Sequence, residues 1–276
     1  MKNALSIDVE DWFCVHNLSG VIRKEDWTKC EPRITESLFR ILKILDEKKV
    51  KATFFVLGWI AGYYPELVKE IDQRGHEIGT HGLSHSLLTE LTPEKFGKEL
   101  KTSIQLIEKN TQKKVIGHRA PSFSITERTY WALDIMAKHG IKYDSSVFPV
   151  SFHPDYGVPS APFEPYKITE ELWEFPLSVV KILGRNVPIS GGGYFRIFPY
   201  RFIRYGIRKA NLQGRPVVFY LHPWEMDPDQ PRVKLPALKN FRHYHNLDKT
   251  EQRFRRLLND FQFTTISEVL HLCIET

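Results

Sequence analysis

Short apolar runs and amphipathic stretches alternate along the first half of the chain. Residues 3–9 and 52–57 are apolar runs of the length that predicts buried strands. Between them, residues 37–49 place Leu38 and Ile41 among charged side chains at the spacing of an amphipathic helix. Strands separated by helices of about 10 to 15 residues predict an α/β fold, with parallel strands joined by right-handed crossovers.

The same alternation continues to residue 144 and returns near the C-terminus. The further elements that it predicts are helices over 65–74, 92–109, 126–139, 200–213 and 250–261, and strands within 74–80, 115–119, 141–144, 172–176 and 216–221. Prolines interrupt the pattern between residues 145 and 214, where we expect long loops. No internal repeat or flexible linker divides the chain, which favours a single domain with a C-terminal elaboration.

Polar side chains stand at the ends of the predicted strands. Because the carboxyl ends of parallel strands meet at one rim, these groups should converge in one pocket. They are Asp8 to Asp11, His81, Arg119, Asp144 and His222.

His81 and His85 are four positions apart, so both imidazoles can turn to one divalent metal if the chain coils there. A pair of packing histidines explains the spacing of these two residues alone as well as a metal site does. The carboxylates near the first strand favour the metal.

Composition narrows the class of protein. With 42% hydrophobic and 26% charged residues, the chain is globular and not disordered. The net charge of +6 favours an acidic partner, although a solvated basic face explains it equally well. Cys14, Cys30 and Cys273 form no Cys-x-x-Cys pair, and neither an apolar leader nor an 18-residue apolar run is present. We therefore expect a cytoplasmic protein.

Five motifs in order resemble those of the polysaccharide deacetylases, also known as the NodB homology domain or carbohydrate esterase family 4. They are Ser6-Ile7-Asp8-Val9-Glu10, Thr80-His81-Gly82-Leu83-Ser84-His85, Arg119-Ala120-Pro121, Tyr143-Asp144-Ser145-Ser146 and Phe219-Tyr220-Leu221-His222. The region after His222 is similar to the extension of a bacterial subfamily linked to exopolysaccharide biosynthesis. The resemblance implies a distorted, seven-stranded, TIM-like (β/α) barrel over residues 1–222, with a C-terminal extension over 223–276 packed on the same domain.

The resemblance also implies a role for each motif residue. His81 and His85 are expected to bind the metal with one carboxylate of the first motif. Asp8 is expected to be the general base and His222 the general acid. The remaining two residues are expected to be their partners: Arg119 pairs with Asp8, and Asp144 orients or tunes His222.

The first motif departs from the family pattern of two adjacent aspartates, because Val9 follows Asp8. The metal carboxylate is therefore Glu10 or Asp11. Strand alternation places Asp8 and Glu10 on one face and favours Glu10, while Asp11 stays open if the strand has already ended.

The implied function is a metal-dependent hydrolase that acts on linear amide bonds, removing acetate from N-acetylhexosamine units of a polysaccharide or lipid-linked precursor. Zn²⁺ is the first expectation for the ion, with Co²⁺ or another divalent ion as the alternative. The expected partner is a carbohydrate and not nucleic acid, with peripheral membrane contact through the basic C-terminal region. Two competing hypotheses are a metal-independent hydrolase of small cyclic amides and a non-catalytic module that binds anionic polymers.

Overall fold

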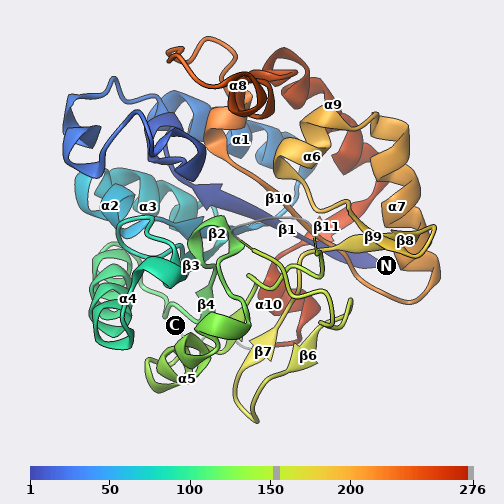
Figure 1. Cartoon of the computed structure of the whole chain (residues 1–276), viewed down its shortest axis with the longest axis horizontal. Helices are drawn as coiled ribbons and strands as arrows, with labels where there is room; N and C mark the ends of the chain where they lie inside the picture. The colour runs from blue at the N-terminus through green and yellow to red at the C-terminus, as the bar shows by residue number, and fades with distance from the viewer. Residues whose placement is uncertain (152–155, 273–276) are drawn as a thin grey trace.

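A curled sheet of mainly parallel strands forms the centre of the computed structural model, which describes residues 1–151 and 156–272 (Figure 1). The order along the sheet is β10-β1-β2-β3-β4-β5-β7-β6, with β11 beside the start of β1. All neighbours pair in parallel except β6 with β7. The strands are β1 (Lys2–Val9), β2 (Thr53–Val56), β3 (Glu77–Thr80), β4 (Gly117–His118), β5 (Tyr143–Asp144), β6 (Tyr166–Lys167), β7 (Trp173–Glu174), β10 (Val218–Leu221) and β11 (Gln262–Thr264).

The chain between β7 and β10 completes the ring. It forms the antiparallel hairpin of β8 (Val179–Ile182) and β9 (Arg185–Pro188) and then runs beside β10. The Tyr220 amide donates to the carbonyl of Ser190 at 2.6 Å, and Gly191 bridges to Tyr220 in parallel. The expectation of a distorted (β/α) barrel is therefore confirmed, with seven parallel strands from β10 to β7 among the described residues.

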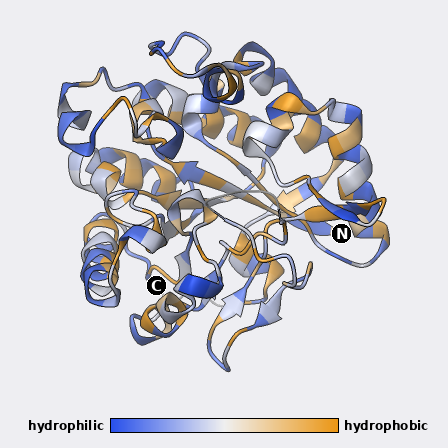
Figure 2. Ribbon diagram, viewed as in Figure 1, coloured by the Kyte–Doolittle hydropathy of each residue, from blue (hydrophilic) through white to orange (hydrophobic). Residues whose placement is uncertain are grey.

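Helices surround the barrel because each has one apolar face (Figure 2). In α1, for example, Leu38, Ile41 and Leu45 are fully buried. The predicted helices are present as α1 (Ile34–Lys48), α3 (Pro65–Gln73), α4 (Pro93–Glu108), α5 (Trp131–Lys138), α7 (Tyr200–Leu212) and α9 (Leu247–Asp260). The sequence pattern missed the short helices α2 (Gly58–Tyr63), α6 (Gly192–Ile197), α8 (Ala237–Tyr244) and α10 (Ile266–Val269).

The region after His222 is tied to the barrel at several points. Strand β11 pairs with β1, and the buried Asp227 forms an ion pair with Arg33 at 2.8 Å. The expected division at residue 222 stays a prediction. Cys14 and Cys30 are free thiols, and Cys273 lies outside the described residues. No helix of the described chain is both long enough and apolar enough to cross a bilayer.

Candidate active site

The carboxyl ends of the parallel strands open into one cavity of about 550 Å³. Asp8 lies near the end of β1 and Glu10 just after it, while His81 and His222 directly follow β3 and β10. Parallel pairing brings these ends to the same rim, as the sequence predicted. The catalytic and metal-binding candidates that line the cavity are Asp8, Glu10, His81, His85 and His222.

Glu10, His81 and His85 form the cluster that can hold a metal. All three are buried, and one ligand atom from each lies within 4.8 Å of the others. Oε2 of Glu10 lies 2.6 Å from Nε2 of His85, yet no donor among the described residues meets it in hydrogen-bonding geometry. Buried ligand atoms that converge at these distances fit a divalent cation.

The local backbone explains how His81 and His85 meet. After β3, Gly82 and His85 adopt left-handed conformations, with φ of 74° and 52°, which coil the segment tightly. Helix α2 fixes this coil, because the amide of Gly58 donates to the carbonyl of Gly82 at 2.8 Å. The two imidazole rings lie 5.3 Å apart as a result.

The protonation states of His81 and Glu10 also suit metal binding. Nδ1 of His81 lies 2.9 Å from the carbonyl oxygen of Arg119, which can only accept, so Nδ1 carries the proton and Nε2 keeps its lone pair. Burial lowers the pKa of His81 to about 4, which keeps the ring neutral. Burial raises the pKa of Glu10, but His85, His222 and His81 together outweigh burial and the pKa of Glu10 falls to about 2. Two imidazoles and a carboxylate form a zinc-type ligand set.

Asp11 has a structural role instead of a metal-binding one. Its carboxylate accepts hydrogen bonds from the backbone amides of Trp12, Arg33 and Ile34 at 2.8 to 3.0 Å. These contacts join the turn after β1 to the start of α1. Asp11 is not part of the cluster that could hold a metal, which joins Glu10 to both histidines, so the structure favours Glu10 over Asp11 as the metal carboxylate.

Arg119 holds Asp8 in place, as expected. Nη1 of this fully buried arginine donates to Oδ1 of Asp8 at 2.8 Å and to Oγ of Ser6 at 2.6 Å. The rest of the guanidinium is fixed by the carbonyl and hydroxyl of Ser145, both at 2.8 Å. Oδ2 of Asp8 has no hydrogen-bond partner among the described residues, and Asp8 lines the cavity. That oxygen is therefore free to accept a proton.

His222 is oriented by Glu225. Nδ1 of His222 lies 2.7 Å from Oε1 of Glu225, whose other oxygen accepts from Nε of Arg196 at 2.6 Å. Burial alone would lower the pKa of His222, but the hydrogen bond to Glu225 and the charges of Glu10, Glu225 and Asp8 raise it to about 9. Nε2 lies 3.8 Å from Asp8 and 3.6 Å from Glu10. At neutral pH the ring is an acid placed beside the candidate base.

The prediction that Asp144 orients His222 is wrong. Oδ1 of Asp144 instead lies 2.6 Å from Nδ1 of His118 and accepts from Oγ of Ser146 at 2.8 Å. The sheet order explains the difference. Strand β5 neighbours β4, so Asp144 and His118 are register partners, whereas β10 lies at the other end of the path.

Trp224 supports the site in a way that the sequence pattern did not predict. Its Nε1 donates to Oε1 of Glu10 at 3.1 Å. The indole is stacked between two imidazoles, with ring centroids 5.3 Å from His222 and 4.6 Å from His243. The region after the barrel therefore supports both the metal carboxylate and the acid. The sequence signal that could have indicated this role is the run His222-Pro223-Trp224-Glu225. In it, His222 caps a 3₁₀ turn that begins at Pro223, directly after β10.

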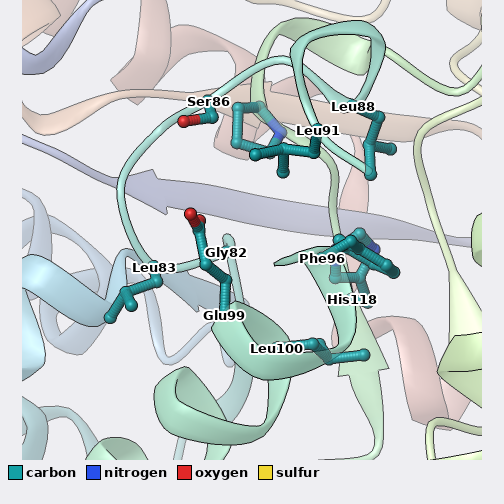
Figure 3. Close-up of a pocket in the computed structure, with 10 residues that line it drawn as sticks. Gly82, Leu83, Ser86, Leu88, Leu91, Phe96, Glu99, Leu100 and His118 are labelled. Carbon is teal, nitrogen blue, oxygen red and sulfur yellow. The ribbon is translucent and has the colours of Figure 1, made fainter. Parts of the chain in front are cut away.

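A second pocket lies behind the metal-binding coil (Figure 3). Apolar side chains such as Leu88, Leu91, Phe96 and Leu100 line it together with His118. Its volume of about 10 Å³ is the space of roughly one water molecule. A sugar can therefore enter only the larger of these two pockets.

Comparisons with known proteins agree with this geometry. Residues 29–143 match the family described as polysaccharide deacetylase, and residues 145–271 match a domain family of unknown function, DUF3473. The two matches meet near residue 144 and not at 222.

Among curated proteins, the chain is 33% identical to a peptidoglycan deacetylase of Helicobacter pylori over 42% of this chain and 39% of that protein. It is 28% identical to a chitooligosaccharide deacetylase of Bradyrhizobium over 35% of this chain and 42% of that protein. The chain thus spans about two fifths of the length of these two relatives.

Solved structures share the fold. The peptidoglycan deacetylase PdaC from Bacillus subtilis superposes with a TM-score of 0.51 at 17% identity, covering 97% of this chain and 89% of that one. A CE4 family pseudoenzyme from Bacillus anthracis gives 0.54 at 15% identity, covering 98% and 65%. Because this fold occurs in a pseudoenzyme as well as in enzymes, the activity has to be argued from the site residues.

Proposed function

We propose that this chain, in which residues 29–143 match the polysaccharide deacetylase family, is a metal-dependent N-deacetylase that hydrolyses the acetamide of N-acetylhexosamine units in a polysaccharide or lipid-linked precursor. The observation that carries the proposal is one cavity that combines a metal-binding cluster with a candidate base and a candidate acid. The deacetylase names of the relatives support the reaction type.

The metal ligands in this proposal are Glu10, His81 and His85. Two imidazoles and one carboxylate are the protein ligands that catalytic zinc sites use, and Co²⁺ accepts the same set. When bound, a divalent ion supplies Lewis acidity that polarises the acetyl carbonyl and makes a water molecule a stronger nucleophile near neutral pH. The buried oxygen of Glu10 without a hydrogen-bond donor supports the assignment.

Asp8 takes the proton from the attacking water in this mechanism. Its Oδ1 is held by Arg119, whose positive charge at 2.8 Å favours the ionised carboxylate. Its Oδ2 remains without a partner among the described residues and can accept the proton. Removing the proton as the water attacks avoids forming a cationic oxygen.

His222 protonates the departing amine nitrogen. An amide needs such a donor because the anion of an amine is a very poor leaving group. Glu225, together with Glu10 and Asp8, raises the pKa of His222 to about 9 and so favours the protonated ring at neutral pH, and Glu225 fixes the orientation of the ring. The products are acetate and a free amino sugar.

Acetate release from N-acetylglucosamine oligomers by zinc-loaded protein tests this function. We expect Asp8→Asn to lower kcat by about a hundredfold or more while zinc stays bound, because the base is lost and the metal ligands remain. Asp229→Asn, at an exposed position outside the cavity, is the matched control and should keep full activity. Unchanged acetate release by Asp8→Asn, or by protein stripped of metal, would contradict the proposal.

Cytoplasmic location remains a prediction that accompanies this function. It implies that the precursor is modified before export. Fractionation of cells that express the native gene tests it, and recovery of the protein outside the inner membrane would contradict it.

A further inference from the structure

Two basic side chains on α8 line the same cavity as the catalytic residues. Lys239 and Arg242 lie one helical turn apart, and both are exposed at the cavity wall. Within residues 1–151 and 156–272, neither side chain forms an ion pair or a hydrogen bond with the protein. Figure 1 shows α8 at the top of the molecule, in the region after the barrel.

Other arginines near this part of the molecule are already neutralised or hydrogen-bonded. Arg196 pairs with Glu225, and Arg255 pairs with Glu47 and Glu251. Arg253 donates to backbone carbonyls of the α6 segment. Among the lysines and arginines that line the cavity, Lys239 and Arg242 are therefore the two that form no ion pair within the described residues.

The carboxylates of the cavity do not neutralise this pair. Asp8 is bound by Arg119, and Glu10 contacts His85 and Trp224. Neither carboxylate forms an ion pair with Lys239 or Arg242 among the described residues, so the charges on α8 remain available to a ligand.

The backbone of α8 is fixed relative to the catalytic acid. Nη2 of Arg196 donates to the carbonyl of Arg242 at 3.0 Å, and Arg196 also binds Glu225, the partner of His222. On the same helix, α8, the backbone carbonyl of Lys239 accepts a hydrogen bond from Nδ2 of Asn17 at 3.0 Å. The backbone that carries the two cations is thus anchored to the residues around the catalytic acid, as the support of a ligand-binding group needs to be.

We propose that Lys239 and Arg242 bind an anionic group, a carboxylate or a phosphate, carried by the substrate close to the N-acetylated sugar. The inference rests on the proposed function and narrows its substrate class from neutral to acidic glycans. An arginine fork and a lysine ammonium are the side chains that bind these anions by charge-assisted hydrogen bonds. A cavity of about 550 Å³ is larger than an acetamide needs and has room for the neighbouring group.

Paired substrates of equal length test the proposal. One is a neutral tetramer of N-acetylglucosamine, and the other is a tetrasaccharide that alternates N-acetylglucosamine with glucuronate. N-acetylglucosamine 1-phosphate forms a third arm, which distinguishes a phosphate site from a carboxylate site. We expect kcat/KM to be higher for one anionic substrate than for the neutral one, with the preference shrinking as salt is raised.

A double variant tests whether Lys239 and Arg242 are the residues that bind the anionic group. Lys239→Gln with Arg242→Gln should reduce the ratio of anionic to neutral kcat/KM by about tenfold to a hundredfold, the loss expected for two charge-assisted contacts. Lys234→Gln with Lys249→Gln removes the same charge from exposed positions that do not line the cavity, and it should leave the ratio unchanged. An equal fall in both double variants would mean a general charge effect and would overturn the site.

Binding measurements separate this inference from the proposed function. Calorimetry with the glucuronate tetrasaccharide and with N-acetylglucosamine 1-phosphate needs no turnover. If the zinc-loaded protein releases no acetate from any substrate, the proposed function fails. Tighter binding of one of these ligands to the wild type than to the Lys239/Arg242 variant would then still support the anion site. Equal affinity of wild type and variant for both ligands overturns it, whether or not acetate is released.

Discussion

The hydrogen bond from Trp224 to Glu10 should strengthen metal binding. Trp224→Phe keeps an aromatic ring in the stack but removes Nε1, which lies 3.1 Å from Oε1 of Glu10. Trp224 is 4% exposed and Glu10 1% exposed, so water cannot easily replace the lost donor. A hydrogen bond to a charged group contributes about 1.5 to 3 kcal/mol. At 1.4 kcal/mol per factor of ten, zinc affinity should fall by about tenfold to a hundredfold.

Competition with a fluorescent zinc chelator measures this affinity. Trp27→Phe is the matched control, because Trp27 is 3% exposed and does not line the cavity. Its zinc affinity should equal that of the wild type. If Trp224→Phe is folded and binds zinc as tightly as the wild type, the indole does not support Glu10 and this reasoning is refuted.

Two further predictions concern the acid and the barrel wall. Glu225→Gln removes a charge that raises the pKa of His222, so the pKa of His222 should fall. The alkaline limb of the pH profile of kcat/KM should then move to lower pH, and an unmoved limb would mean that His222 is not the acid. Gly191→Ala should destabilise the fold by about 3 kcal/mol or more in urea unfolding, because its Cβ would lie 1.9 Å from the carbonyl oxygen of Tyr220 at a φ of 130°. Gly20→Ala has nothing within 4 Å and is the control; equal stability of the two variants would contradict the close approach of Gly191 to β10.

The sequence predicted the barrel and the candidate metal cluster because both depend on local patterns. The strands are marked by short apolar runs, and parallel order brings their ends together whatever the details of the loops. Strand alternation also identified Glu10 ahead of Asp11, since Asp8 and Glu10 fall on one face. The carboxylate of Asp11 instead accepts hydrogen bonds from the backbone amides of Arg33 and Ile34 at the start of α1. This contact joins segments more than twenty residues apart.

The partner of His222 could not be found in the same way. The family pattern implied Asp144, but the sheet places that residue beside His118. The true partner, Glu225, is only three positions after His222, and its charge is balanced by Arg196 from α6. Periodicity does not predict such a contact, because it depends on how a short turn and a distant loop pack together.

The position of a bound zinc ion in crystals of the zinc-loaded protein is the most direct test of the whole account. Anomalous diffraction at the zinc edge should show one ion about 2.0 to 2.2 Å from a carboxylate oxygen of Glu10 and from nitrogens of His81 and His85. Asp8 and His222 should then face the open side of that ion across the cavity. An ion held by Asp11, or no ion between the two histidines at saturating zinc, would contradict the account.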